Sequence, residues 1–472
     1  MIFSERFPQN LTAPANAFYL GLGYPLFVGA MTLLGYVTGT ELYLNAVNTL
    51  FLAVGLLITE SALPLIPTFM MYVFQTSLIN SPENNIGSDY YHDPMVIGVM
   101  AGLILTILSA SVYIFIKNGR FSKKSFASLP FPLAAAFLSF AFIFCGAFCP
   151  RWTAYDTLYG VIMAAEYFLI FYFFFIGLRG ENTERLIDYT TASGAVTALL
   201  LSAETAHLYI TSDTLIVGGE IVKEQVLYGW GMWTMAGQFL ALTIPLCFLG
   251  VMRGKRVWFF FSAATLALVS AVMTLSRNGL LVAGAAYFAS ALACCFVGRR
   301  KRIFRIALPI GIAAALLIIV FYREELLSLL SDYIDRGFSD NGRFSLWDHG
   351  IESFLSYPVF GMGFFGIQRG LAEGCAEGFS FYPRMMHNTP IQLLGSMGIF
   401  GTLAYAYYRY KTLLPFVKKP SLQKTMLGAS LLVTVTASLI DNFLFLPKHL
   451  IIYSIILAVS FALSEEGGNK SI

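Results

Sequence analysis

Long apolar runs without any charged residue recur along this chain and exclude most soluble folds. Two of them, Met95–Ile116 and Val257–Leu275, contain no Lys, Arg, Asp or Glu, and about 18 such residues are enough for a helix to cross a bilayer. Only 12% of the 472 residues are charged, about half the fraction usual in soluble proteins. Lipid offers the backbone no water to bond, so membrane segments of this kind fold as helices. We therefore expect an all-α fold, a polytopic membrane helix bundle.

The hydropathy pattern predicts about 14 transmembrane helices. The second and third of them are short, and could instead form one hairpin that does not fully cross the membrane. The predicted spans are 17–38, 42–59, 61–80, 95–116, 130–149, 157–178, 190–210, 230–252, 257–275, 278–297, 303–322, 386–408, 425–443 and 449–464.

Basic residues between the spans predict the orientation of the bundle. Five connections carry most of the Lys and Arg, and each follows an even-numbered span, so all five lie on one side. Because positively charged connections stay in the cytoplasm, we expect this side and both termini to be cytoplasmic. The five connections are 117–124, 179–185, 253–256, 299–305 and 409–424.

The opposite side holds one large extracytoplasmic loop, residues 323–385, and a connection of this length is usually functional or disordered. Apolar residues recur in it at helical spacing in two places, which predicts two amphipathic helices lying on the outer membrane surface. A solvated spacer is the alternative. The two sets are Leu326, Leu327, Leu330, Tyr333 and Ile334, and Trp347, Ile351, Phe354 and Leu355.

Two arginines on the outer side are candidate functional residues. Arg277 follows Ser276 in a very short outward turn; burying a charge near the membrane is costly, which suggests function, although an arginine can also anchor a helix end at the headgroups. Arg343 begins the second amphipathic helix, where free N–H groups and a guanidinium suit a phosphate. A surface salt bridge to Asp340 or Asp348 is the alternative reading of Arg343.

A histidine closes the large loop. His387 is preceded by Arg384 and followed by Asn388, at the point where the next span begins. Imidazole accepts a proton near neutral pH and could assist attack by a sugar hydroxyl, or it could simply cap the helix end. Asp441 and Asn442 form a polar outer turn that could line the same site.

Other function classes lack support in the sequence. The net charge of +3 is too small to suggest a nucleic-acid partner. The six cysteines lack the spacing of zinc sites, and we expect neither a metal nor a cofactor. The glycine string Gly361–Gly366 lacks the strand and the βαβ context of a dinucleotide site.

Taken in order, these motifs resemble the O-antigen ligase and polymerase superfamily. The resemblance covers roughly positions 270 to 402. It lies in the turn Ser276–Gly279, the helix start Arg343–Trp347, Pro358 followed by Gly361 and Gly363, and His387-Asn388 before the glycine-rich segment Gly395–Gly401.

The resemblance implies an inverting, metal-independent glycosyltransferase at the outer face of the bacterial cytoplasmic membrane. Its donor would be a polyprenyl-diphosphate-linked glycan, and its acceptor a hydroxyl of another glycan, a lipid or a protein. The expected catalytic residues are His387, Arg277 and Arg343. The residues expected to bind substrate are Arg384, Asn388, Ser276 and Asp441. Asp441, Asp335 and Asp340 are the alternative carboxylates for deprotonating the acceptor hydroxyl in place of His387.

The chain is expected to divide into an N-terminal transmembrane bundle (1–229), a ligase- or polymerase-like core that includes the loop (230–408) and a C-terminal transmembrane hairpin (409–472). The alternative function is a flippase or other carrier of lipid-linked oligosaccharide. A carrier needs charged residues at several depths of a central cavity, whereas the candidates here lie at the outer surface. Membrane lipid is a further expected partner in either case.

Overall fold

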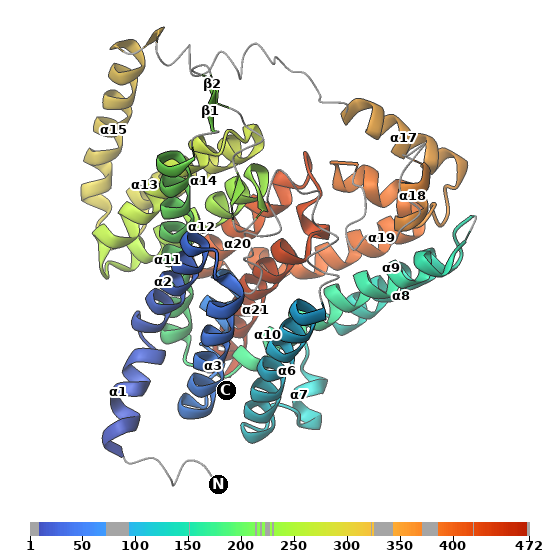
Figure 1. Ribbon diagram of the computed structural model, residues 1–472, viewed down its shortest axis with the longest axis horizontal. Coiled ribbons are helices and arrows are strands. Elements are labelled where there is room, and N and C mark those ends of the chain that lie inside the picture. The colour runs from blue at the N-terminus through green and yellow to red at the C-terminus, as the bar shows by residue number, and fades with distance from the viewer. Residues whose placement is uncertain are drawn as a thin grey trace.

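The computed structural model shows a bundle of long helices (Figure 1). The first predicted amphipathic helix, around 326–334, lies outside the described residues. The structure describes residues 9–71, 94–150, 152–212, 215–217, 220–221, 227–228, 231–321, 323–324, 343–370, 386–418 and 420–469.

Helices make up nearly all of the described chain. In the first half they are α1 (Gln9–Tyr19), α2 (Gly23–Thr38), α3 (Glu41–Thr59), α4 (Leu65–Met71), α6 (Pro94–Lys117), α7 (Lys123–Ala127), α8 (Pro132–Ala147), α9 (Ala154–Ala165), a π-helix (Glu166–Ile170), α10 (Phe171–Leu178) and α11 (Thr183–Thr211). In the second half they are α12 (Trp233–Arg253), α13 (Val257–Met273), α14 (Arg277–Phe296), α15 (Lys301–Phe321), α17 (Arg343–Ser356), α18 (Phe364–Gly370), α19 (Thr389–Lys418), α20 (Leu422–Ala437), a 3-10 helix (Phe443–Phe445) and α21 (Pro447–Asn469).

Between α11 and α12 the structure has two very short antiparallel hairpins. In the first, β1 (Ile216–Val217) pairs with β2 (Glu220–Ile221), with Ile216 opposite Ile221. In the second, β3 (Leu227–Tyr228) pairs with β4 (Gly231–Met232), with Leu227 opposite Met232. These two-residue strands decorate one connection and leave the helical architecture of the bundle unchanged.

Seven of the described helices are long and apolar enough to cross a membrane, or eight if the bent pair α1 and α2, which meet at 59°, is one span. The helical membrane bundle is therefore confirmed, and the count of about 14 stays a prediction. Several other predicted spans coincide with helices that are shorter, such as α8 and α13, or broken, such as α19. The seven are α3, α6, α9 with α10, α11, α12, α14 and α21.

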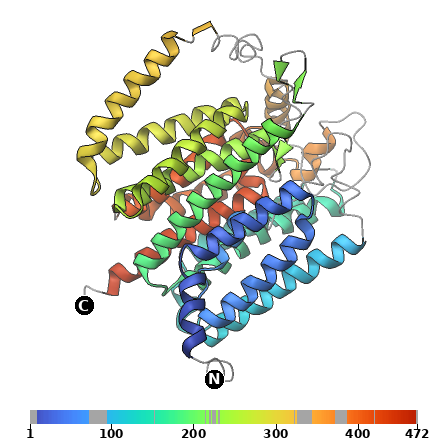
Figure 2. The same cartoon turned by 60° about the vertical axis from the view of Figure 1, so that its left-hand side comes forward.

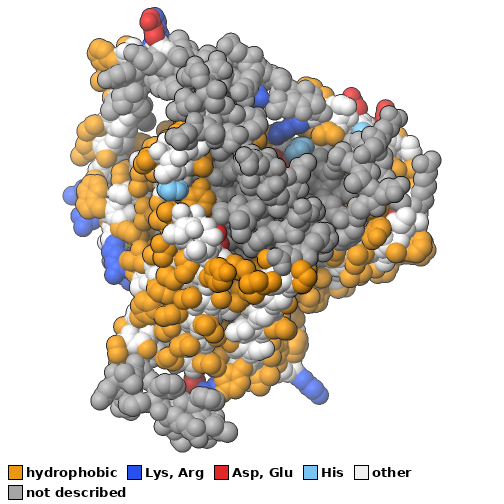
Figure 3. Space-filling view, in the orientation of Figure 1, with side chains coloured by type: hydrophobic (Ala, Val, Ile, Leu, Met, Phe, Trp, Pro, Cys, Tyr) orange, Lys and Arg blue, Asp and Glu red, His pale blue; other side chains and the backbone are white. Residues whose placement is uncertain are grey.

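Helix α12 is the centre of the bundle. Its apolar residues occur on all sides, which is typical of a fully buried helix, and 94% of its apolar window is buried. Helices α11, α13, α14 and α20 pack around it. On the outside, large side chains such as Leu105, Leu133 and Trp258 are exposed, and hydrophobic side chains cover much of the visible face (Figure 3). An apolar surface of this extent indicates contact with lipid.

Two of the basic connections bond to neighbouring segments. Arg179 Nη1 donates to the carbonyl of Ser125 at 2.9 Å, and Arg253 Nε donates to Asp188 Oδ1 at 2.8 Å. The start of α1 and the end of α21 lie at the end of the bundle away from α17 (Figures 1 and 2). The cytoplasmic location of these connections and of both termini stays a prediction.

Arg409 does not lie in a connection, where we expected it. Helix α19 continues past position 408 to Lys418, and the Arg409 side chain is buried inside the bundle. Its guanidinium carbon lies 4.7 to 5.8 Å from the ring centres of four tyrosines, which share the charge as cation–π partners. These are Tyr167, Tyr405, Tyr408 and Tyr453.

Because this tyrosine cage holds Arg409, we expect Arg409→Ala to destabilise the fold by about 3 kcal/mol, from a lost desolvated cation–π interaction and an unfilled space. Thermal unfolding in detergent micelles measures the change. Lys411→Ala is the matched control, since Lys411 lies on the same helix against tyrosines of its own helix and is expected to cost less than about 1 kcal/mol. Equal loss of stability in the two variants would contradict the structural role of the cage.

Candidate functional site

The site is organised by a break in α19. Gly398 has φ 59° and ψ −160°, a conformation essentially restricted to glycine, and it divides α19 into two helical segments. The connector 358–363, between α17 and α18, pairs its backbone with this break and so satisfies polar groups that the helix leaves unbonded. The bonds run from Met362 N to Gly395 O (2.9 Å), Gly363 N to Ser396 O (2.8 Å), Ile399 N to Pro358 O (2.8 Å) and Phe400 N to Val359 O (3.1 Å).

The two glycines of the string Gly361–Gly366 that match the family pattern have a backbone role here. Gly361 and Gly363 have φ of 71° and 75°, values that side-chain-bearing residues rarely adopt. A Cβ at Gly361 would lie 2.4 Å from the backbone nitrogen of Met397. These glycines therefore allow the connector to reach the broken helix.

Ser276 begins α14 as its N-cap. Its Oγ accepts a hydrogen bond from Gly279 N at 3.1 Å, which satisfies one of the unpaired N–H groups of the first turn. Gly279 also lies directly against Gly237 of α12, since a Cβ on Gly279 would be 3.0 Å from the Cα of Gly237. The start of α14, with Arg277 as its first residue, is thereby held close to the central helix.

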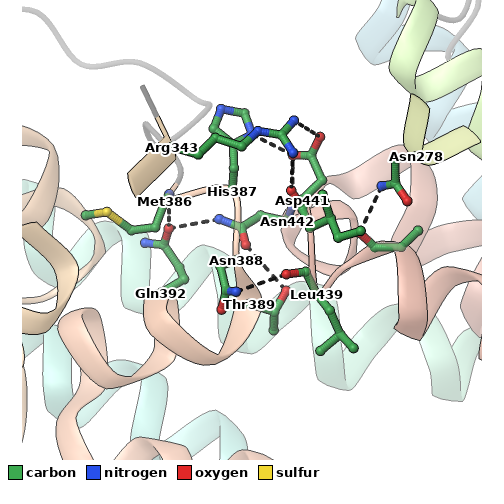
Figure 4. Close-up of polar contacts among 12 residues, drawn as sticks. Asn278, Arg343, Met386, His387, Asn388, Thr389, Gln392, Leu439, Asp441 and Asn442 are labelled. Carbon is green, nitrogen blue, oxygen red and sulfur yellow. Dashed lines mark hydrogen bonds and ion pairs between the residues drawn. The ribbon is translucent and has the colours of Figure 1, made fainter. Parts of the chain in front are cut away.

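The turn 437–442, which links α20 to the 3-10 helix, is contacted from two sides. Asn278 Nδ2 donates to Ala437 O at 3.1 Å, so the start of α14 lies beside the turn. From the other side, Asn388 Nδ2 donates to Leu439 O at 2.9 Å. Three segments that are far apart in the sequence therefore meet at this turn (Figure 4).

His387 and Asp441 are hydrogen-bonded. His387 Nδ1 lies 2.8 Å from Asp441 Oδ1, and the same oxygen accepts from Asn442 N at 3.0 Å. The His387 side chain is 41% exposed and that of Asp441 13% exposed. His387 has φ 50°, in the left-handed region, where uncommon conformations often accompany function.

Arg343 completes this group. Its Nη1 donates to Ile440 O at 2.9 Å, and its Nη2 lies 3.9 Å from Asp441 Oδ2. The guanidinium, 27% exposed, therefore lies on the same carboxylate as His387 (Figure 4). The ion pair that the structure shows for Arg343 joins α17 to the turn 437–442, and the predicted alternative partner Asp340 lies outside the described residues.

Gln392 is a buried polar residue that the sequence reasoning missed. Its Oε1 accepts from Met386 N and from Asn442 Nδ2, both at 2.9 Å, and its Nε2 donates to Ser396 Oγ at 2.9 Å. The available signal was a single amide side chain within an apolar, glycine-rich helix. Such a residue is costly to bury unless each of its polar atoms is bonded.

The structure brings most of the predicted site residues to one place. The turn 437–442, which contains Asp441, is contacted by Arg343, His387 and Asn388. Ser276 and Arg277 lie at the neighbouring start of α14. Arg384, Asp335 and Asp340 lie outside the described residues.

The second predicted amphipathic helix is present as α17. It packs on α19 through Gly350, where a Cβ would lie 2.5 Å from Ile391. Ile351 and Leu355 are exposed rather than packed on the bundle, because the small residue Gly350 forms the contact with α19. The placement of this helix on the outer membrane surface stays a prediction.

The arrangement is suited to removing a proton beside a bound anion. A carboxylate only accepts hydrogen bonds, so Asp441 directs the proton of neutral His387 to Nδ1 and makes Nε2 the basic nitrogen. The guanidinium of Arg343 provides fixed positive charge close by, and its planar donors suit phosphate oxygens. Among the described residues, no group of three or more His, Cys, Asp or Glu side chains is placed to hold a metal ion.

Comparison with known proteins identifies one region of this chain. The family model described as O-antigen ligase matches residues 262–406, which include the start of α14, the helix α17 and His387. No curated protein matches the chain. The match confirms the resemblance found in the sequence, over nearly the same segment.

Proposed function

Residues 262–406 of this chain match the O-antigen ligase family, and on that premise we propose that the chain is a member of the O-antigen ligase and polymerase superfamily and propose its reaction. It transfers a polyprenyl-diphosphate-linked glycan to an acceptor hydroxyl, on the extracytoplasmic face of the bacterial cytoplasmic membrane. The family match by itself supports a membrane protein that transfers glycan. The donor, the side of the membrane and the chemistry below are part of the proposal.

The observation that carries the proposal is the shared contact of His387 and Arg343 with Asp441. A base and a fixed cation on one carboxylate match the two needs of this transfer, which are to activate a hydroxyl and to stabilise a diphosphate leaving group. The three residues come from α17, the start of α19 and the turn after α20. Their meeting is consistent with a built site rather than with separate surface contacts.

In the proposed reaction, the acceptor oxygen attacks the anomeric carbon of the donor sugar. His387 Nε2 takes the proton of the acceptor hydroxyl as the new carbon–oxygen bond forms. The bond from the anomeric carbon to the diphosphate oxygen breaks, and the polyprenyl diphosphate leaves with the bonding electrons. Attack from the face opposite the leaving group inverts the anomeric carbon.

Positive charge takes up the charge that develops on the leaving diphosphate. Arg343 lies beside His387 and is the first candidate for this role; Arg277, at the start of α14, and Arg384 are further candidates. Two or three guanidinium groups can stabilise a diphosphate without a metal ion, because each offers fixed, preorganised donors. Asn388 and Ser276 are assigned to the same substrate site, and the polyprenyl tail would extend into the surrounding membrane lipid.

Reconstitution into liposomes separates this transferase from the rival function, a carrier of lipid-linked oligosaccharide. Purified protein with a polyprenyl-diphosphate-linked glycan and an acceptor glycan is expected to form an enlarged glycan and free polyprenyl diphosphate, also in the presence of EDTA. Gel electrophoresis and thin-layer chromatography measure the two products. Movement of the intact donor across the bilayer without a new glycosidic bond would favour the carrier and contradict the proposal.

A further inference from the structure

We propose that Gln392 is a positioning residue that holds His387 against Asp441; the inference rests on the proposed function. Gln392 lies in the first segment of α19 and is 1% exposed. It does not touch the exposed face of the site, so its effect must act through other residues. Its amide group is hydrogen-bonded to Met386, Asn442 and Ser396.

The side-chain carbonyl oxygen of Gln392 links the two chain segments that carry His387 and Asp441. Met386, which donates to it, directly precedes His387, and Asn442, the second donor, directly follows Asp441. A carbonyl oxygen has two lone pairs, and both are used here at 2.9 Å. One buried atom therefore joins the backbone just before His387 to the side chain just after Asp441, and it adds to the bonds from Asn388 Nδ2 to Leu439 O and from Thr389 N to Ser438 O.

The amide nitrogen of Gln392 connects the same point to the break in α19. It donates to Ser396 Oγ at 2.9 Å, and the carbonyl of Ser396 accepts from Gly363 N at 2.8 Å. Asn442 is also fixed from its other side, since Thr389 Oγ1 lies 3.4 Å from its Oδ1. Gln392, Asn442, Thr389 and Ser396 are all buried, so water does not compete for these bonds.

The pattern requires a side chain that accepts twice and donates once. A leucine at position 392 would leave Met386 N and Asn442 Nδ2 without their acceptor, and the residues next to His387 and Asp441 would lose their shared bond. A glutamate would keep both accepted bonds, and the Ser396 hydroxyl can turn to donate to it. Gln392→Leu therefore removes the two accepted hydrogen bonds, whereas Gln392→Glu removes only the amide group and keeps these bonds.

The test compares Gln392→Leu with Gln392→Glu, in the full-length protein in liposomes, with a polyprenyl-diphosphate-linked glycan as donor. We expect Gln392→Leu to lower kcat by roughly 10- to 100-fold, the size of effect seen when a residue that orients a reacting group is lost. The KM for the donor should stay within about threefold, because Arg343 Nη1 donates to Ile440 O and makes no bond to Gln392 itself. Gln392→Glu should restore most of the lost kcat.

Two further variants interpret the result. Asn48→Leu places the same side chain at another buried amide position, on α3, and is expected to leave kcat unchanged, which controls for the introduction of a buried leucine. His387→Ala tests the proposed function itself. If His387→Ala abolishes transfer while Gln392→Leu leaves kcat unchanged, or raises KM alone, the positioning role is wrong and the proposed function stands. If His387→Ala also retains full transfer, the proposed function fails.

Discussion

Replacing His387 with alanine is expected to lower the rate of glycan transfer by about 10²- to 10⁴-fold, the range that a general base contributes. The alanine removes the nitrogen that takes the proton of the acceptor hydroxyl. It leaves Asp441 in place, with its contacts to Asn442 N and Arg343, so the turn 437–442 keeps its structure. Transfer of a labelled donor glycan in liposomes measures the loss, and size-exclusion chromatography checks that the variant stays folded.

A substitution of Asp441 tests the His387–Asp441 pair a second time. Asp441→Asn keeps the size of the side chain but presents an amide to His387 Nδ1, so it no longer fixes the proton on that nitrogen. We expect a smaller loss of transfer than in His387→Ala, of at least about tenfold. His207→Ala is the control, because His207 lies on α11 against Tyr36 and takes no part in the proposed reaction. Unchanged transfer in both His387→Ala and Asp441→Asn would contradict the assignment of His387 as the general base.

Gly398→Ala is expected to destabilise the protein by about 3 kcal/mol or more and to reduce transfer as well. The added Cβ would lie 2.5 Å from the carbonyl carbon and oxygen of Val359, which is closer than packed atoms approach. The backbone angles at Gly398 also cost a residue with a side chain about 1–3 kcal/mol. Relief of the clash would move the connector 358–363 away from Ser396, and with it the support of the site.

Thermal unfolding in micelles, followed by tryptophan fluorescence, measures the stability of Gly398→Ala. Gly102→Ala is the matched control, since a Cβ at Gly102 of α6 meets nothing within 4 Å. In that open helical position alanine is expected to stabilise slightly, by up to about 1 kcal/mol. An equal unfolding temperature for wild type and Gly398→Ala would show that α19 can close its break, contrary to our account.

The separate parts of the site were predictable because charged and polar residues stand out in an apolar sequence. Arg343 and His387 could be named as candidates, since burying such groups near a membrane is costly. Their common partner could not be assigned in the same way. His387 and Asp441 are 54 positions apart, and no local pattern reports a 2.8 Å contact between the residue before one helix and the turn after another.

Two errors have the same origin. Hydropathy places Arg409 in a basic connection because the apolar run ends there, yet two of the tyrosines around it, Tyr167 and Tyr453, come from other helices and cannot be seen in the local pattern. Gln392 was passed over because a single amide within an apolar helix carries little weight in a hydropathy profile. In both cases some of the partners that stabilise the buried group are distant in sequence: Tyr167 and Tyr453 for Arg409, and Asn442 for Gln392.

The apolar spans and the helical class follow from local chemistry, because hydropathy acts on each segment wherever its neighbours lie. The bend of α19 at Gly398, the insertion of the connector 358–363 into it and the joining of His387, Arg343 and Asp441 do not follow in this way. They depend on which helices pack together, since each requires backbone or side-chain bonds between segments that the chain order separates.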